Sequence, residues 1–159
     1  MLMKNYARVD LSFVKGKGSE LKDSCGKKYI DFASGIGVCS LGHGHKGLAK
    51  VISKQAKTLI HTSNIYRIEP QERLAHKMSR LLGGDYSLFF GNSGAEANEC
   101  AIKLARKWGY KHGKSGIISL ANSFHGRTIA TLKLTGQDKL HPEHFAPYPG
   151  EVGFCASID

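Results

Sequence analysis

A turn of small residues between a short apolar stretch and a long amphipathic helix is the feature that most constrains this fold. Residues 87–90 (SLFF) predict a strand, and helical periodicity runs from Ser93 to Trp108. Ser93 is followed three residues later by Glu96, which is the capping-box pattern of a helix N-terminus. The face of this helix that the periodicity predicts to be buried consists of Ala97, Cys100, Ala101, Leu104 and Trp108.

A second apolar stretch at residues 116–120 predicts another strand, and the proline-containing stretch 141–159 ends in a third. Strand, helix and strand at this spacing form a β-α-β unit, in which the strands run parallel and the helix packs on the sheet. Open α/β sheets bind their ligands at the carboxyl ends of the strands. The sequence therefore predicts an α/β fold with a candidate site at the turn of residues 92–95.

The first half predicts a hairpin, a loop and two helices. Residues 19–32 alternate around the turn DSCGK, and the loop 33–47 holds five glycines, so it must bend sharply or approach another segment closely. His43 and His45 lie in this loop without nearby thiolate or carboxylate companions, so we expect hydrogen bonds rather than a metal site.

Two amphipathic helices follow, one from about His45 to His61 and one that begins at Pro70 and stops at Gly83. The buried stripe predicted for the second helix consists of Leu74, Met78, Leu81 and Leu82.

Composition excludes several function classes. The formal net charge is +10, but the 17 lysines are scattered and form no basic block, so nucleic-acid binding is not the expected function. A basic surface that attracts anionic small molecules explains the charge more simply. The chain has no apolar run of membrane-spanning length, no signal-peptide pattern, and four cysteines without a C-x-x-C pair. We therefore expect a cytoplasmic protein with free thiols and no membrane partner.

The turn at residues 92–95 has two interpretations. In the first, Ser93 only caps the helix. In the second, Gly94 and Ala95 leave the helix N–H groups open to an anion, because they carry little or no side chain. Neither G-x-x-x-x-G-K nor G-x-G-x-x-G occurs at this turn, so the commoner phosphate loops are excluded. From the residues alone, capping and anion binding stay equal alternatives.

The next strand ends in NSFHGRT, which offers two more candidates. Phe124 is either an ordinary core residue or a flat ring that stacks on a planar ligand. Arg127 is either a surface arginine or a fork of donors for a carboxylate. Because the two strand ends would meet at one edge of the sheet, the combination favours a site.

Four stretches together resemble the class III pyridoxal-phosphate-dependent aminotransferases. They are FFGNSGAEANECAIKLARKWGY, NSFHGRT, HTSNIYRIEPQERLA and SELKDSCGKKYIDFASGIGVCSLGHGH. The resemblance covers the chain from about Lys15 onward, and HTSNIY followed by EPQ favours the branch that acts on acetylornithine. One departure is Lys46, where the family usually has proline.

The resemblance implies the N-terminal part of a fold type I transferase: a β-hairpin and helix, then the start of a mainly parallel sheet with packed helices. Residues 1–62 would contribute to the small domain, and residues 63–159 would form the first part of the large domain that binds pyridoxal 5′-phosphate. The cofactor-binding residues that it implies are Ser93, Gly94, Ala95 and Phe124. The substrate-binding residues that it implies are Arg127 for the α-carboxylate and Tyr66 at the border of the pocket.

The resemblance also implies what the chain lacks. Family members are far longer, and the lysine that binds the cofactor lies in the part that would follow Asp159. None of the lysines of this chain matches it, so we expect no catalytic residue here and no activity from the isolated chain.

The implied reaction is transamination between N2-acetylornithine and 2-oxoglutarate in arginine biosynthesis, by a homodimer. The alternatives are a class III enzyme for ornithine, 4-aminobutyrate or succinyl-diaminopimelate, and a non-catalytic remnant that binds phosphate.

Overall fold

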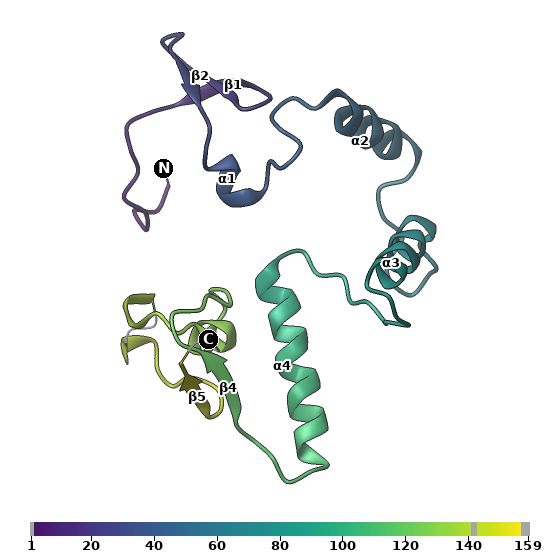
Figure 1. Ribbon diagram of the computed structural model, residues 1–159, viewed down its shortest axis with the longest axis vertical. Helices are drawn as coiled ribbons and strands as arrows, with labels where there is room; N and C mark the ends of the chain where they lie inside the picture. Colours follow the sequence, from purple (N-terminus) through teal and green to yellow (C-terminus); the bar gives the residue numbers. More distant parts are fainter. Residues whose placement is uncertain (1, 141–142, 157–159) are drawn as a thin grey trace. The chain divides into compact units, whose positions relative to one another are not determined.

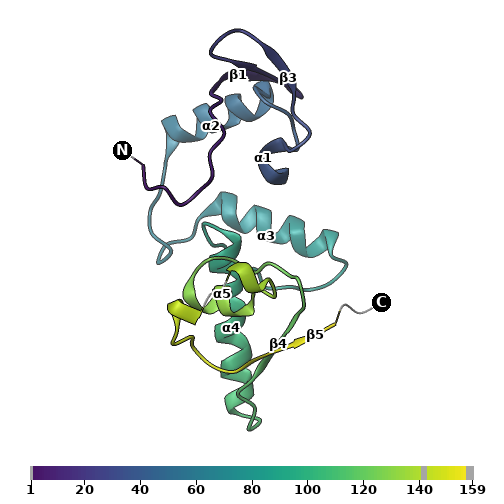
Figure 2. The same ribbon diagram turned by 90° about the vertical axis from the view of Figure 1, so that its left-hand side faces the viewer.

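The computed structural model describes residues 2–140 and 143–156 of the chain (Figures 1 and 2). The chain divides into two compact units, Met1–Ile68 and Glu69–Asp159. The assignment of residues 1–62 and 63–159 to a small and a large domain remains a prediction.

The first unit contains a three-stranded antiparallel sheet in the order β1-β2-β3. Its strands are β1 (Phe13–Lys17), β2 (Glu20–Asp23) and β3 (Lys28–Ile30). β2 and β3 form the predicted hairpin, and β1 adds a strand that the sequence pattern did not indicate. The carboxylate of Asp23 fixes the hairpin turn, because its Oδ1 accepts the backbone N–H groups of Cys25 and Lys27 at 2.9 and 2.8 Å.

The glycine-rich loop both bends sharply and approaches the hairpin, as predicted. Residues 34–37, labelled α1 (Ser34–Gly37), form a left-handed turn in which all four φ angles are positive. Further on, Gly18 and His43 exchange backbone hydrogen bonds of 2.9 and 2.8 Å. A Cβ on Gly42 would lie 2.9 Å from the Cα of Gly18, so this approach requires glycine.

His43 also anchors the loop through its side chain. Its Nε2 lies 2.7 Å from Oδ2 of Asp31, while Oδ1 of the same carboxylate accepts the N–H groups of Ala33 and Ser34. These contacts, first the one with the His43 side chain and then the one with the Ser34 N–H, lower the pKa of Asp31. Asp31 therefore joins the end of β3 to both ends of the loop.

Both predicted amphipathic helices are present, as α2 (Lys46–Thr58) in the first unit and α3 (Glu69–Leu81) in the second. His45 is the N-cap of α2 and accepts the N–H of Leu48 through Nδ1 at 3.0 Å. The loop histidines thus form hydrogen bonds, as predicted. The expectation that no carboxylate lies near them is wrong, because Asp31 contacts His43.

The second unit continues with the longest helix and a parallel strand pair. Its elements after α3 are α4 (Gly94–Tyr110), β4 (Ile117–Leu120), α5 (Ile129–Leu134), the 3-10 turns η1 (Asp138–Leu140) and η2 (Glu143–Phe145), and β5 (Val152–Cys155). β4 and β5 pair in parallel, with Ile117 opposite Val152 and Leu120 opposite Cys155. α4 lies beside β4 and α5 (Figure 1). The α/β class with a parallel sheet is confirmed.

The prediction of a strand at residues 87–90 is wrong. This stretch is extended chain without a ladder, and no strand among the described residues pairs with it. A strand needs the N–H and C=O groups of a neighbour, and apolar composition alone does not supply them.

The core of the second unit lies between α4 and α5. Ile102, Leu132 and Leu134 are its buried apolar side chains, at 5 to 6% exposure. Thr131 and Thr135 are fully buried beside them. Their hydroxyls are satisfied locally, since Thr135 Oγ1 accepts the N–H of His125 at 3.1 Å and Thr131 Oγ1 accepts that of Thr128 at 3.1 Å.

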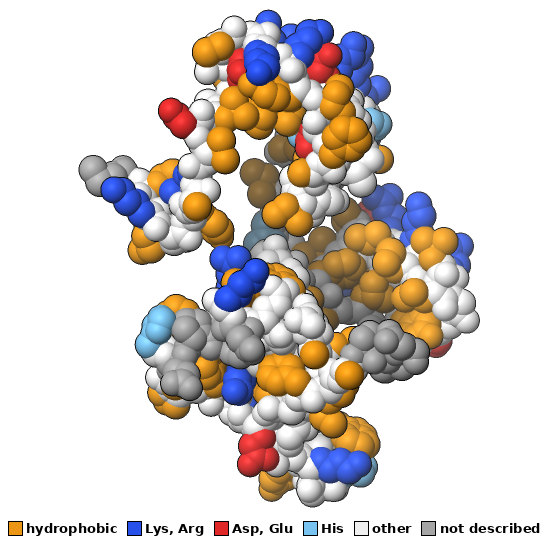
Figure 3. All heavy atoms as spheres, turned by 60° about the vertical axis from the view of Figure 1, so that its left-hand side comes forward, with side chains coloured by type: hydrophobic (Ala, Val, Ile, Leu, Met, Phe, Trp, Pro, Cys, Tyr) orange, Lys and Arg blue, Asp and Glu red, His pale blue; other side chains and the backbone are white. Residues whose placement is uncertain are grey.

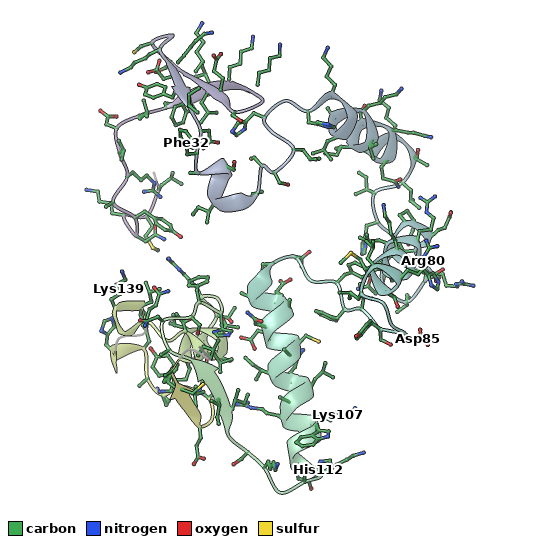
Figure 4. The ribbon with its side chains drawn as sticks, viewed as in Figure 1. Phe32, Arg80, Asp85, Lys107, His112 and Lys139 are labelled. Atoms are coloured by element: carbon green, nitrogen blue, oxygen red, sulfur yellow. The ribbon has the colours of Figure 1, made fainter. Side chains whose placement is uncertain are left out.

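The predicted apolar stripes exist, but in this structure they are not buried. Leu74 is 46% exposed in α3, and Leu104 and Trp108 are 62% and 55% exposed in α4. Hydrophobic side chains accordingly gather on the visible surface in Figure 3, and Phe32, labelled in Figure 4, is 95% exposed. Helical periodicity specifies which face is apolar, whereas burial requires a second surface to cover that face.

The exposed area gives the scale of this effect. The chain exposes 13609 Å², whereas two separate compact domains of these sizes would expose about 9,400 Å² together. The excess is of the size of a large protein interface, roughly 4,000 Å². Among the described residues, no helix is both long and apolar enough to cross a bilayer.

Acid should release the loop from Asp31. The folded state lowers the pKa of this carboxyl below its ordinary value, so its stabilising hydrogen bonds are complete above the unfolded pKa of about 3.9 and are lost as the pH falls through the folded value. We expect the amide chemical shifts of Ala33 and Ser34 to titrate with a midpoint below about 3.9. Asp31→Ala should abolish this titration, and Asp10→Ala should leave it unchanged. A midpoint at or above the ordinary value would contradict the assignment.

Candidate functional site

The turn before α4 is a helix cap of the predicted kind. Ser93 is the N-cap, with extended backbone angles, and its Oγ accepts the N–H of Glu96 at 3.2 Å. The carboxylate of Glu96 reaches back one residue further than the standard box: it accepts the backbone N–H of Asn92 and lies 3.3 Å from Nδ2 of Asn92. The cap therefore holds the whole turn against the first turn of α4.

The same turn leaves donors available for an anion. Within the described residues, the N–H groups of Gly94 and Ala95 have no acceptor, because the cap takes the N–H of Glu96 instead. A Cβ built on Gly94 meets no atom within 4 Å, so the space in front of the turn is open. Unpaired N–H groups at the positive end of a 17-residue helix suit a phosphate. Capping and anion binding are thus compatible at this turn.

A second segment, residues 124–128, lies directly against the start of α4. Gly126 has a φ of +134°, and a Cβ on it would lie 2.7 Å from Cβ of Ala95 and 2.6 Å from Oγ1 of Thr131. Only glycine allows this approach. The segment that we call the FHGR loop is thereby held next to the candidate phosphate turn. Sequence reasoning assigned no role to Gly126, although its position between two candidate residues was a usable signal.

Two polar side chains of α4 secure this contact. Asn98 donates from Nδ2 to the backbone carbonyl of His125 at 2.7 Å. Glu99 accepts the hydroxyl of Thr128. Sequence reasoning missed both residues as members of the site, because a polar residue on an amphipathic helix is ordinarily a solvated one.

Phe124 and Arg127 lie together on the exposed side of the FHGR loop. The ring of Phe124 is 55% exposed in this structure. The guanidinium carbon of Arg127 lies 6.0 Å from the centroid of that ring. The loop therefore offers an accessible aromatic face and a cation side by side.

Tyr66 belongs to the first unit, Met1–Ile68. It is 64% exposed, and its backbone N–H donates to the carbonyl of Ser63 at 3.2 Å. Its role at the border of a substrate pocket stays a prediction.

A cavity of about 240 Å³ lies between α4 and β4, behind the FHGR loop. Asn98, Ile102, Ser119 and His125 are among the residues that line it. The hydroxyl of Ser119 lies 3.4 Å from Nδ1 of His125 and donates to the carbonyl of Leu134 at 2.6 Å. The lining of this cavity is mostly apolar, and its polar members are Asn98, Ser119 and His125.

Two groups of the candidate site fit parts of pyridoxal phosphate. The open N–H groups suit its phosphate, and the exposed ring of Phe124 suits its planar ring. That the chain has no lysine for its aldehyde stays a prediction. Lys107 lies on the side of α4 away from β4 (Figure 4), and Nζ of Lys133 lies 5.4 Å from the ring centroid of Tyr148.

The contact of Gly126 with Ala95 predicts different effects on stability for alanine substitutions at Gly126 and Gly94. Gly126→Ala should destabilise the second unit by at least about 2 kcal/mol, because the new Cβ overlaps Ala95 and the φ angle is strained. Gly94→Ala places its Cβ in open space and should be neutral or stabilising by up to about 1 kcal/mol. Urea titrations followed by circular dichroism measure both. Equal effects of the two substitutions would contradict the packing.

Curated relatives share this sequence at high identity. An acetylornithine aminotransferase of Wolinella succinogenes is 54% identical over 162 residues, which cover 99% of this chain and 41% of the relative. That of Aquifex aeolicus is 48% identical over 151 residues, which cover 94% of this chain and 40% of the relative. The chain thus spans about two fifths of the length of these relatives.

Solved structures match the fold as well. The ornithine aminotransferase of Toxoplasma gondii superposes with a TM-score of 0.89 at 29% identity, over 99% of this chain and 38% of that protein. The N-acetylornithine aminotransferase of Stenotrophomonas maltophilia superposes with a TM-score of 0.70 at 40% identity, over 76% of this chain and 34% of that protein. The profile of the family described as aminotransferase class-III matches residues 2–158. With this match over nearly its whole length, the chain belongs to the class III aminotransferases.

Proposed function

We propose that this chain is the N-terminal part of an aminotransferase that exchanges the amino group of N2-acetylornithine with the oxo group of 2-oxoglutarate. The products would be N-acetylglutamate semialdehyde and glutamate. Support for this substrate comes from the relatives at 54% and 48% identity, both of them acetylornithine aminotransferases. We further propose a cytoplasmic homodimer, in which residues 1–62 contribute to a small domain and residues 63–159 begin the large one.

One observation carries the proposal: the FHGR loop is docked on the N-terminus of α4 by the Gly126–Ala95 contact. A phosphate-binding turn, an accessible ring and an arginine then lie on two adjacent segments. Each of these features alone has an ordinary explanation. Their combination matches a ligand that joins a phosphate to a planar ring, close to a carboxylate.

In this proposal, the residues have separate tasks. The N–H groups of Gly94 and Ala95, with Ser93 at the same turn, bind the phosphate of pyridoxal 5′-phosphate, and Phe124 stacks on its ring. Arg127 orients the substrate by its α-carboxylate. When bound, the cofactor supplies an electron sink for the charge that develops on the carbon that carries the transferred amino group, which is the δ-carbon of N2-acetylornithine.

The catalytic lysine is not among these residues. Transamination requires a lysine that holds the cofactor and moves a proton at the carbon that carries the transferred amino group. We therefore propose that the chain by itself is inactive. A non-catalytic phosphate-binding protein is the second candidate, and the observation that favours it is an open phosphate turn without a matching lysine.

Other members of the family use other amino donors. The Toxoplasma gondii ornithine aminotransferase shares the fold, at 29% identity. We favour acetylornithine because the identity to the acetylornithine enzymes is higher. Enzymes for 4-aminobutyrate or succinyl-diaminopimelate stay as alternatives.

Binding of pyridoxamine 5′-phosphate tests the cofactor site, because this amine cannot form an imine with surface lysines. We expect calorimetry to give tighter binding than for inorganic phosphate. Phe124→Leu should weaken the binding of pyridoxamine 5′-phosphate by about fivefold and leave that of inorganic phosphate unchanged, since stacking on a ring contributes roughly 1 kcal/mol. Phe145→Leu removes another exposed ring of the same unit and should change nothing. Equal affinity for the two ligands in the unsubstituted chain would contradict the site.

The missing lysine has its own test. The chain mixed with acetylornithine, 2-oxoglutarate and pyridoxal phosphate should give no turnover, and borohydride should label no single lysine. Turnover with one labelled lysine would overturn this assignment. Reading the coding DNA beyond codon 159 should reveal a lysine-bearing remainder in some frame, whereas unrelated sequence there would favour the non-catalytic candidate.

A further inference from the structure

We infer that Asn98 and Glu99 are positioning residues, which hold the aromatic ring and arginine of the FHGR loop in register with the phosphate turn. The inference rests on the proposed function and deepens it, because it assigns the alignment of the two halves of the site to two adjacent residues of α4.

The contacts bracket the part of the loop that would touch a ligand. Asn98 holds the carbonyl of His125 at 2.7 Å, and Glu99 holds the hydroxyl of Thr128. Phe124 lies immediately before the first anchor, and Arg127 lies immediately before the second. Both candidate ligand-binding side chains are therefore one peptide unit from a fixed point on α4.

The loop needs such anchors because its middle is glycine. Gly126 has no side chain of its own to pack, and glycine has more backbone freedom than any other residue. The contact with Ala95 restricts how closely the loop approaches α4, but a contact of this kind has no direction. Hydrogen bonds at His125 and Thr128 supply the direction, since their strength depends on angle.

The charge of Glu99 also supports a positioning role. Glu99 follows Gly94 by five residues, a backbone rise of about 7.5 Å along the helix axis. A negative charge there repels a phosphate at the helix N-terminus and so opposes binding. The hydrogen bond that Glu99 accepts from Thr128 gives this carboxylate a structural role despite that cost.

Thr128 transmits this anchor into the fold. It is the N-cap of α5, its Oγ1 lies 2.7 Å from Oγ1 of Thr131, and its N–H donates to the same oxygen at 3.1 Å. Thr131 is fully buried. Glu99 therefore connects the loop to the core residues of α5 as well as to α4.

The test compares two ligands and two substitutions at one position. Glu99→Ala should weaken the binding of pyridoxamine 5′-phosphate about tenfold, which is the effect of losing one hydrogen bond to a charged group. Binding of inorganic phosphate, which needs only the turn, should be unchanged or tighter. Glu99→Gln keeps an acceptor for Thr128 and should bind both ligands at least as well as the unsubstituted chain. Asn98→Ala should likewise weaken the binding of pyridoxamine 5′-phosphate and leave that of inorganic phosphate unchanged. Lys107→Ala, on the exposed side of α4, is the control and should change neither affinity.

Hydrogen exchange gives a readout that needs no ligand. In Glu99→Ala the amides of His125 and Thr128 should exchange at least about tenfold faster, whereas Glu99→Gln should protect them as before. Unchanged amide exchange in Glu99→Ala, or an equal loss of affinity for both ligands, would overturn the inference. If the unsubstituted chain does not prefer pyridoxamine 5′-phosphate, the proposed function fails, and the exchange measurement still decides the inference.

Discussion

The contact between Gly126 and Ala95 is the constraint on which the rest of the second unit depends. It lets the backbone of the FHGR loop lie against the Cβ and Cα of Ala95 in the first turn of α4. A methyl group at Gly126 would separate the two segments, and the hydrogen bonds of Asn98 and Glu99 would lose their reach. The site therefore depends on the close approach of the loop backbone to α4, which the side chains of Asn98 and Glu99 direct.

The start of α4 combines two tasks that use different donors. The first four N–H groups of a helix have no partner within it. Ser93 takes the one from Glu96, which stabilises the turn, and leaves those of Gly94 and Ala95 open. A turn that was held less firmly would lose entropy on binding an anion, so the cap also prepares the site.

The first unit uses the same device for a different purpose. Gly18 and Gly42 approach closely, and the Asp31–His43 contact secures the approach with a hydrogen bond of 2.7 Å. In both units a glycine permits the contact and a polar side chain directs it. The large apolar surfaces of both units are not used in this way, since many large hydrophobic side chains of the described residues are exposed, among them Leu104 and Trp108. These faces are ready to be covered by other surface.

Local chemistry explains what the sequence determined by itself. Helix positions, the Ser93 cap, the hairpin and the sharp glycine loop depend on residues close together in the chain, so their patterns predicted them. The candidate residues at the phosphate turn and in the FHGR loop were identified from residue types and from the family resemblance. Only the tertiary structure decided what lies against what. It excluded the strand at residues 87–90, exposed the predicted apolar stripes, and brought Asn98 and Glu99 to the FHGR loop. The physical reason is that strand pairing, burial and long-range hydrogen bonds each need a partner from elsewhere in the chain, and no local pattern specifies that partner.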